Sequence, residues 1–357
     1  MIEEITNNKI LLEDLEYISN SNIEFDKMKN STVLVTGGTG LIGVSLIRAL
    51  LYINEKHNTH IKIISLVRNE NKAKNIYGKI LDRNDFELLL NDINNKVNTN
   101  EKIDYIFHCA SITTSKTMIE KPVETLMTSV NGTKNILDLA ASKNVKSVVY
   151  VSSMEMYGTF DNSYSEIDEE KLGFIDPLKV RSNYPESKRL CENMCIAYLS
   201  EYNVHVKIAR LAQTFGAGIL QSENRVFAQF ARSVIEHKDI VLHTLGKSEG
   251  NYCYTSDTVT GLFSILLNGN DGEAYNVSNT ETHTTISEMA KMVCEEIADN
   301  KIKVIYDIPK DNKFGYAADT KMKLNSDKLQ SLGWKPEINL KNAYLRLIDS
   351  LNIDSKM

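Results

Sequence analysis

The feature that most constrains this chain is a glycine-rich turn at residues 37–43, between a strand-like and a helix-like segment. The strand-like segment, residues 32–36, is short and rich in β-branched side chains. Residues 41–57 have the apolar spacing of a helix. The glycines recur as Gly-x-x-Gly-x-x-Gly, and a strand before them with a helix after them is the context in which such a turn binds nucleotides.

Each glycine of the turn has a separate expected role. Gly37 permits the tight turn after the strand, Gly40 lets the backbone approach a pyrophosphate, and Gly43 lets the helix pack closely on the sheet. The helix then begins at Leu41 and Ile42, whose free N–H groups and positive dipole end face the phosphates. The turn therefore predicts a bound dinucleotide.

Strand-like and helix-like segments alternate from residue 31 to residue 210. Strands are expected at residues 32–36, 61–67, 103–109, 147–152 and 204–210, and helices at 41–57, 123–142 and 184–202. Strands separated by helices form βαβ units with a parallel sheet and helices on both faces. We therefore predict an α/β fold with a doubly wound, NAD(P)-binding Rossmann domain at residues 31–210.

The ends of the chain differ from this alternating region. After residue 210 the alternation weakens, which predicts a smaller mixed α/β lobe at residues 211–357, interleaved with the first domain and binding the substrate. Residues 1–30 carry Ile10, Leu11, Leu15 and Ile18 at helical spacing. They are expected to form a helical extension packed on the main body, the alternative being a disordered tail.

Composition excludes several classes of partner. The net charge of −6 gives no basic surface for nucleic acid or anionic lipid. No apolar run approaches the ~18 residues that span a bilayer, and the acidic start lacks the positive region of a signal peptide. The five cysteines form no CxxC pair, and the seven histidines show no metal-ligand spacing. A cytoplasmic protein without a metal, a membrane or a nucleic-acid partner is expected.

The end of the second expected strand bears on the choice of dinucleotide. NAD-binding Rossmann units place an Asp or Glu there to hold the ribose 2′-hydroxyl. This strand ends without a carboxylate, and Arg68 follows, where a guanidinium could pair with a 2′-phosphate. NADP(H) is therefore favoured over NAD(H); the alternative is that Arg68 is a solvated surface charge.

A second pattern supplies acid–base chemistry. Tyr184 and Lys188 lie four residues apart near the start of an expected helix, capped by Asn183, and so share one face. An ammonium group beside a phenol is expected to lower the pKa of Tyr184 towards neutrality, which suits proton exchange with an alcohol. Ser153 follows a strand and is expected to point into the same crevice, or else to be a plain strand-end residue.

With these segments the chain resembles the extended short-chain dehydrogenases, specifically the NAD-dependent epimerase/dehydratase family that acts on nucleotide sugars. The segments that carry the resemblance are TGGTGLIG (36–43), DYIFHCA (104–110), SSMEMYG (152–158), YPESK (184–188) and LGWKPEINL (332–340). The resemblance implies that Ser153, Tyr184 and Lys188 are catalytic, with Tyr184 as the proton shuttle. Lys188 would also bind the nicotinamide ribose. It further implies a homodimer formed through a four-helix bundle of helices 123–143 and 184–202.

The resemblance also assigns binding residues. Ala110 and Ser111 would lie along the cofactor, and Ile80 near its adenine end. The substrate would meet Ser153 and the C-terminal lobe. Within that lobe the expected contacts are Gln213, which stands where the family often has Asn, together with Arg225 and Tyr252. Arg225 either binds the diphosphate or is a surface charge at a helix start, and Tyr252 lines either the lobe or its core.

Departures from the family pattern bear on the reaction. Glu155 stands where dehydratases and decarboxylases of the family carry a glutamate, but the neighbouring acid of the hexose 4,6-dehydratases is replaced by Met154. Gly250 stands where relatives usually have an arginine, which counts against decarboxylation. These departures and Arg68 favour an NADPH-dependent ketoreductase acting on a nucleotide-linked sugar or ketose. The alternatives are a 4-epimerase or 4,6-dehydratase with tightly bound NAD, favoured by Glu155, and a non-catalytic NADP-binding sensor.

Overall fold

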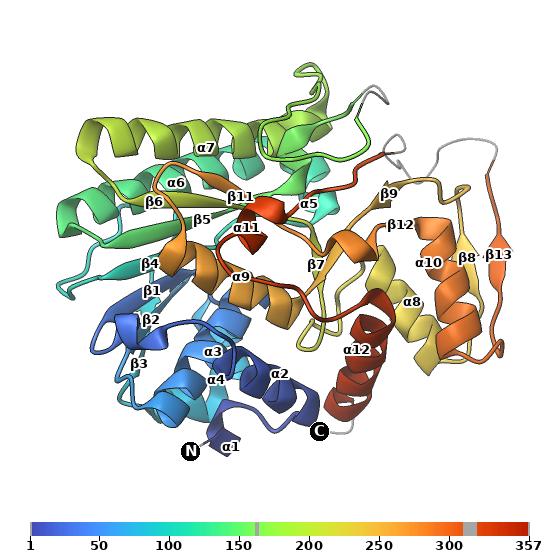
Figure 1. The fold of residues 1–357 in the computed structure, drawn as a ribbon, viewed down its shortest axis with the longest axis horizontal. Helices are drawn as coiled ribbons and strands as arrows, with labels where there is room; N and C mark the ends of the chain where they lie inside the picture. The colour runs from blue at the N-terminus through green and yellow to red at the C-terminus, as the bar shows by residue number, and fades with distance from the viewer. Residues whose placement is uncertain (1, 161–163, 310–319, 356–357) are drawn as a thin grey trace.

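The structure is a computed structural model that describes residues 2–160, 164–309 and 320–355. A seven-stranded parallel sheet, in the order β11-β6-β5-β4-β1-β2-β3, runs through the larger part of the molecule (Figure 1). Its strands are β1 (Thr32–Thr36), β2 (Lys62–Val67), β3 (Phe86–Leu90), β4 (Tyr105–His108), β5 (Ser147–Ser153), β6 (Val206–Leu211) and β11 (Ala274–Val277). The predicted α/β class and the five predicted strands are confirmed.

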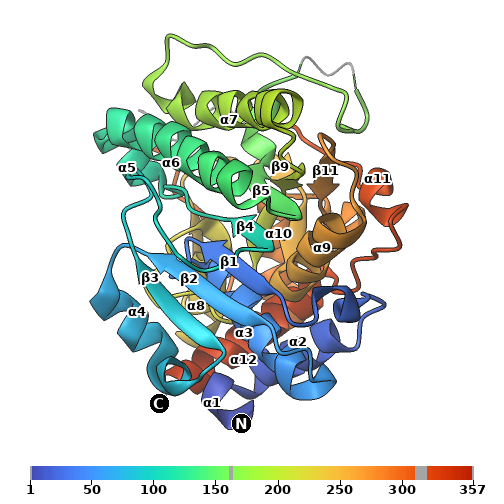
Figure 2. The ribbon, with the colours of Figure 1, turned by 90° about the vertical axis from the view of Figure 1, so that its left-hand side faces the viewer.

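Helices cover both faces of this sheet (Figures 1 and 2). One face carries α3 (Leu41–His57), α4 (Glu70–Tyr77) and α9 (Thr255–Asn268), and the other α6 (Pro122–Lys143) and α7 (Asn183–Tyr202), with the short α5 (Ser115–Glu120) before α6. The strands are therefore apolar on both sides. In β1, Val33 and Val35 belong to the core under α3 and α9, while Leu34 between them belongs to the core under α6 and α7.

Two parts of the sheet differ from the sequence prediction. The edge strand β3 and the helix α4 before it were not expected. The other edge strand, β11, comes from beyond residue 210 and pairs with β6. The C-terminal part of the chain thus completes the sheet as well as building the smaller lobe.

The smaller part of the molecule contains three two-stranded sheets and several helices. The paired strands are β7 (Gln213–Phe215) with β10 (Tyr252–Tyr254), β9 (Glu249–Gly250) with β12 (Thr284–Thr285), and β8 (Ile240–Leu242) with β13 (Val304–Tyr306). The helices are α8 (Val226–Ile235), α10 (Ile286–Met292), the π-helical turn η6 (Val293–Ile297) and α12 (Leu340–Asp354). The short α11 (Asp327–Gln330) packs instead against β11 and α9 of the larger part. The core of the smaller part is aromatic: the Phe215 ring stacks on Phe227 at 4.8 Å and lies 5.2 Å from Tyr344. Residues 310–319 and 356–357 of the predicted lobe lie outside the described residues.

Short 3₁₀ helices occur between these elements. They are η1 (Phe25–Met28), η2 (Gly78–Asp82), η3 (Met154–Tyr157), η4 (Val180–Ser182) and η5 (Thr280–Thr282). In the described part of the chain, no helix has both the length and the apolar character needed to cross a bilayer.

The N-terminal segment forms two helices, α1 (Ile2–Ile5) and α2 (Lys9–Ser19). Helix α2 packs against α3, α9 and α12, so it lies where the two parts of the molecule meet (Figure 1). Its buried Asp14 accepts hydrogen bonds from Arg346 of α12, at 2.8 and 3.1 Å, and from the Tyr254 hydroxyl at 2.9 Å. These polar contacts fix α2 between the smaller lobe and the sheet.

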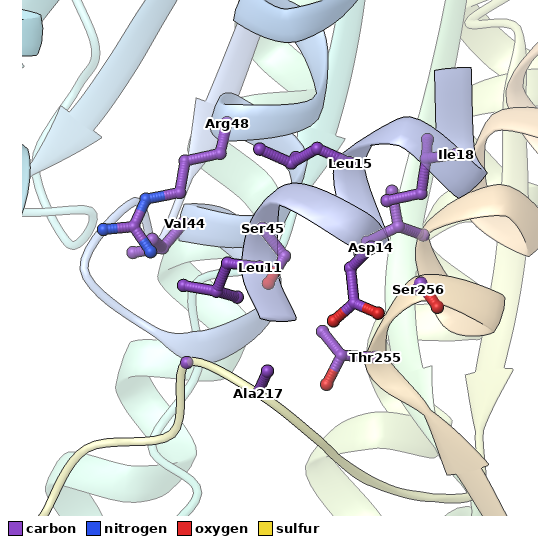
Figure 3. A pocket seen from close by; sticks show the side chains of 12 residues that line it. Leu11, Asp14, Leu15, Ile18, Val44, Ser45, Arg48, Ala217, Thr255 and Ser256 are labelled. Atoms are coloured by element: carbon purple, nitrogen blue, oxygen red, sulfur yellow. The ribbon is translucent and has the colours of Figure 1, made fainter. Parts of the chain in front are cut away.

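A small cavity of about 20 Å³ lies between α2, α3 and the start of α9 (Figure 3). Figure 3 shows the Arg48 side chain extending away from Asp14 along its wall. A cavity of this size has room for about one water molecule. None of the residues that the sequence assigns to the active site lines it.

Candidate active site

The glycine turn is built as the sequence predicts. Gly37 has φ +68°, and a Cβ atom there would lie 2.9 Å from the backbone of Ala110. At Gly43 a Cβ atom would lie 2.4 Å from the carbonyl oxygen of Gly37. Gly40 differs, because its φ of −93° suits any residue and a Cβ atom would meet only the Gly37 carbonyl oxygen, at 3.4 Å. The chain itself therefore requires glycine at 37 and 43, whereas the described residues give no steric reason for glycine at 40.

The strand ends around the turn are held by a polar network. The Thr36 hydroxyl lies 2.8 Å from His108 Nδ1 and accepts the N–H of Ala110 at 3.1 Å. Burial lowers the pKa of His108 to about 3, so the imidazole is neutral. On the other side of the turn, the Tyr77 hydroxyl donates to the Gly38 carbonyl. Sequence reasoning missed Tyr77, because it belongs to the unexpected helix α4.

The predicted cofactor residues lie at the carboxyl ends of β1, β2 and β4, with one exception. Leu41 and Ile42 begin α3, Arg68 is exposed just after β2, and Ala110 and Ser111 follow β4. In parallel α/β sheets this edge is where ligands bind. The Ser111 hydroxyl is buried and has no hydrogen-bond partner among the described residues. Buried polar groups normally have a partner, so this hydroxyl is able to form a hydrogen bond to a ligand.

Ile80 is the exception. It lies in η2, which leads into the amino end of β3, and its side chain is 1% exposed within the hydrophobic core. The residues that follow the carboxyl end of β3, beside the end of β2, are instead Asp92 and Ile93. Ile93 also contacts the helix α6 at Gly132. Ile80 therefore packs in the core at the amino end of β3, away from the sheet edge where the other predicted cofactor residues lie.

The structure brings Ser153, Tyr184 and Lys188 together. Ser153 ends β5, while Tyr184 and Lys188 lie in the first two turns of α7. The Lys188 ammonium donates to the Val151 carbonyl at 2.8 Å and lies 5.7 Å from the centre of the Tyr184 ring. Asn183 does not cap α7: it is the first helical residue, and its side chain donates to the Met118 carbonyl at 2.6 Å.

The expected lowering of the Tyr184 pKa is not found in the ligand-free site. Burial raises the pKa of Tyr184 above its ordinary value, and the nearby Glu155 carboxylate adds to this effect. The Ser153 hydroxyl and the cations of Arg181 and Arg225 act in the opposite direction. Burial also lowers the pKa of Lys188. Desolvation of the phenol therefore outweighs the charges around it, and Tyr184 holds its proton.

Glu155 is the second residue of η3, the 3₁₀ helix that follows Ser153. Its backbone N–H donates to the Ser153 hydroxyl at 3.2 Å. Its carboxylate accepts two hydrogen bonds from one terminal nitrogen of Arg181, at 2.9 and 3.2 Å. The Arg181 guanidinium lies 5.9 Å from the centre of the Tyr184 ring. A carboxylate, a guanidinium and a phenol are thus grouped beside the Ser153 hydroxyl. Sequence reasoning did not identify Arg181.

The predicted residues of the substrate lobe take different places. Gln213 and Tyr252 face each other in register between β7 and β10. Tyr252 is 7% exposed and packs edge-on against Phe215 in the aromatic core, so most of its side chain lines the core. Arg225 precedes α8 and pairs with Glu223 at 2.8 Å. Its positive charge also favours a lower pKa of Tyr184. Of these residues, Arg225 is the one that the electrostatics connect to Tyr184.

Met154 and Gly250, the two departures from the family pattern, are neighbours. A Cβ atom added at Gly250 would lie 3.6 Å from the Met154 methyl group and 3.9 Å from the Met322 carbonyl oxygen. Met154 is buried in a small apolar cluster with Met156, Met322 and others. An apolar surface therefore occupies the place where the family pattern leads one to expect an acid and an arginine.

A glycine turn before a helix, with a Ser–Tyr–Lys group at the same sheet edge, defines an enzyme that binds a nicotinamide dinucleotide. A profile of the "NAD dependent epimerase/dehydratase family" matches residues 33–278, and the chain belongs to this family. Among curated proteins it is similar to UDP-glucuronic acid decarboxylase 6 of Arabidopsis thaliana, with 29% identity over 315 residues, covering 88% of this chain and 87% of the relative.

Solved structures give the same fold. UDP-glucose 4-epimerase from Thermotoga maritima superposes with a TM-score of 0.74 at 19% identity, covering 91% of this chain and 99% of that one. dTDP-glucose 4,6-dehydratase from Bacillus anthracis, solved in complex with NAD, gives a TM-score of 0.73 at 19% identity, covering 91% and 98%. The chain is thus an enzyme of the epimerase/dehydratase family, and the family match favours the epimerase and dehydratase alternatives over the ketoreductase expected first.

Proposed function

We propose that the chain is a nucleotide-sugar epimerase that holds its dinucleotide tightly, as NAD, and catalyses no net oxidation. The observation that carries this proposal is the Glu155 carboxylate, paired with Arg181 beside Tyr184. A ketoreductase needs one proton donor, which Tyr184 supplies. A second proton-transfer group in the same site fits removal of a proton from carbon, which is acidic only next to a carbonyl group.

The residues divide the work as follows. The nicotinamide ring, when bound, supplies reversible hydride acceptance from a sugar carbon. Tyr184 exchanges the proton of the hydroxyl on that carbon, and Ser153 hydrogen-bonds the same oxygen. Glu155 would then take the proton from the carbon next to the transient ketone, and water would return a proton to the opposite face. Glu155 would release its own proton to solvent, so that atoms and charge balance over the cycle. Lys188 would hold the ribose of the bound dinucleotide, and Arg225, which pairs with Glu223 in this structure, would pair with the substrate diphosphate.

The apolar pair Met154 and Gly250 narrows the choice within the family. Loss of water from C6 needs an acid near the leaving hydroxyl, and a methionine cannot give a proton. Decarboxylation benefits from a cation beside the substrate carboxylate, and Gly250 has no side chain. The curated relative is named a decarboxylase, but these two positions argue for epimerisation in this chain.

Hydrogen exchange tests the proposal directly. Purified protein is incubated in D₂O with UDP-glucose, dTDP-glucose or UDP-glucuronic acid, and the sugar is examined by mass spectrometry and NMR. We expect deuterium at the carbon next to the oxidised position, and loss of this label in Glu155→Gln. Turnover of a probe without deuterium at carbon would contradict the role of Glu155.

A second candidate, the NADPH-dependent ketoreductase, is favoured by Arg68, which is exposed just after β2. The two functions predict different cofactor behaviour. An epimerase recycles its dinucleotide, so NAD should be released in stoichiometric amount when the purified protein is denatured. A reductase exchanges NADPH at every turnover, and Arg68→Asp should then weaken NADPH binding much more than NADH binding.

We also propose a homodimer through α6 and α7. These helices pack side by side and expose apolar side chains, among them Val123 (70%), Met127 (44%) and Leu190 (50%). Unpaired apolar surface of this kind marks protein contacts. Sedimentation should show a dimer that Met127→Glu and Leu190→Glu together convert to a monomer.

A further inference from the structure

Arg181 connects the two elements that carry the reacting groups. It lies in η4, three residues before Tyr184, while Glu155 lies in η3, two residues after Ser153. The Arg181–Glu155 ion pair, at 2.9 Å, is therefore a cross-link between the end of β5 and the start of α7. The side chains are 32% and 35% exposed, so the pair lies at the wall of the site and not in the core.

Hydrogen bonds from α7 hold the backbone that follows Glu155. Arg189 of α7 donates to the carbonyls of Met156 and Tyr157, at 2.6 and 3.0 Å. These contacts fix η3 but do not reach the Glu155 side chain. The direction of the carboxylate then depends on Arg181, whose guanidinium also lies over the Tyr184 ring.

We propose that Arg181 is a positioning residue for Glu155: it holds the carboxylate beside the reacting carbon, and it does not itself contact the reacting atoms. This inference rests on the proposed function, in which Glu155 removes a proton from carbon. A misplacement of about 1 Å can cost on the order of 100-fold in rate. Loss of Arg181 should therefore slow the Glu155 step strongly. The Tyr184 step should slow less, because it loses only one of the groups that lower the pKa of Tyr184, while Ser153 and Arg225 remain.

The test separates these two steps. With whichever of the three probes labels the wild type, the reduction of bound NAD reports the Tyr184 step, and deuterium at carbon reports the Glu155 step. Arg181→Gln should lower the labelling rate by about 10- to 100-fold. NAD reduction should fall by a clearly smaller factor, because only one of the groups that lower the pKa of Tyr184 is lost. Arg181→Lys should restore part of the labelling, because an ammonium still pairs with a carboxylate. Lys179→Gln, an exposed cation on the same segment, is the matched control.

A double variant tests whether Arg181 acts through Glu155. In the Glu155→Gln background, adding Arg181→Gln should change the residual labelling rate by less than about 2-fold. The effects of two substitutions do not add when one residue acts through the other. Losses that multiply would overturn the proposal, and so would equal losses in NAD reduction and labelling.

A crystal structure of ligand-free Arg181→Gln tests the positioning role of Arg181 without any substrate. The Glu155 carboxylate should turn away from the Tyr184 ring while η3 keeps its backbone. A carboxylate that stays in place would overturn the positioning role. If no probe labels the wild type, the proposed function fails, and this structure still tests Arg181.

Discussion

Gly40 and Gly43 should fail for different reasons when each is replaced by alanine. In Gly43→Ala, the added methyl group meets the Gly37 carbonyl oxygen at 2.4 Å and two further backbone atoms within 3.0 Å. Overpacking of this kind costs about 3 kcal/mol at the upper end of its range, and the better helix propensity of alanine returns about 1 kcal/mol. The net loss of stability in the cofactor-free protein should be about 2 kcal/mol.

Gly40→Ala should leave the cofactor-free protein nearly as stable as the wild type, because the nearest atom lies at 3.4 Å and φ is −93°. The methyl group would project towards the phosphates, and overpacking of about 1–3 kcal/mol corresponds to a loss of affinity of about 5- to 150-fold. Thermal unfolding of the cofactor-free proteins and calorimetric titration with NAD⁺ and NADP⁺ measure the two effects. Unchanged affinity for both dinucleotides in Gly40→Ala would refute a pyrophosphate at this turn.

Three further changes test the site and its support. Tyr184→Phe should abolish turnover of the probes and leave NAD binding within about 3-fold by titration; measurable turnover would exclude Tyr184 as the proton shuttle. Asp14→Ala leaves the cation of Arg346 without its buried partner and should cost about 2–4 kcal/mol in urea unfolding, with a smaller loss in Asp14→Asn; equal losses would argue against the ion pair. His108 has a folded-state pKa of about 3 against about 6.5 unfolded, so its contribution to stability is present above pH 6.5 and is lost as the pH falls towards 3. The stability of His108→Asn should therefore fall less steeply than that of the wild type between pH 7.5 and 5.

The long periodic segments could be predicted from sequence, and the short polar ones could not. The helix expected at residues 41–57 has the bounds Leu41–His57 in the structure, since its apolar face is long and its glycine start is distinctive. The helix α4 is largely polar, and β3 is a half-exposed edge strand. Neither has the continuous apolar pattern that marks a buried element. Because β3 was not expected, nothing in the sequence indicated that Ile80 lies at the amino end of a strand and packs in the core.

Within the site, motif residues were predictable and tertiary contacts were not. Ser153, Tyr184 and Lys188 follow from spacing on a strand end and a helix. Arg181 lies at the end of a long irregular stretch without periodicity, so its contact with Glu155 depends on how that stretch folds back. The raised pKa of Tyr184 has a similar origin, because desolvation depends on burial, which no local pattern reports.

The contacts between α2 and α12 join residues that lie far apart in the sequence. Asn8 donates to the Ser350 hydroxyl at 2.9 Å across 342 positions of sequence, and Arg346 reaches Asp14 in the same region. During synthesis, Asn8 and Asp14 of the α2 region are made long before α12, so these contacts cannot form until α12 has been made. Contacts of such high sequence separation form late and slowly in folding, so the closing step in the maturation of this enzyme should be the docking of α12 onto α2.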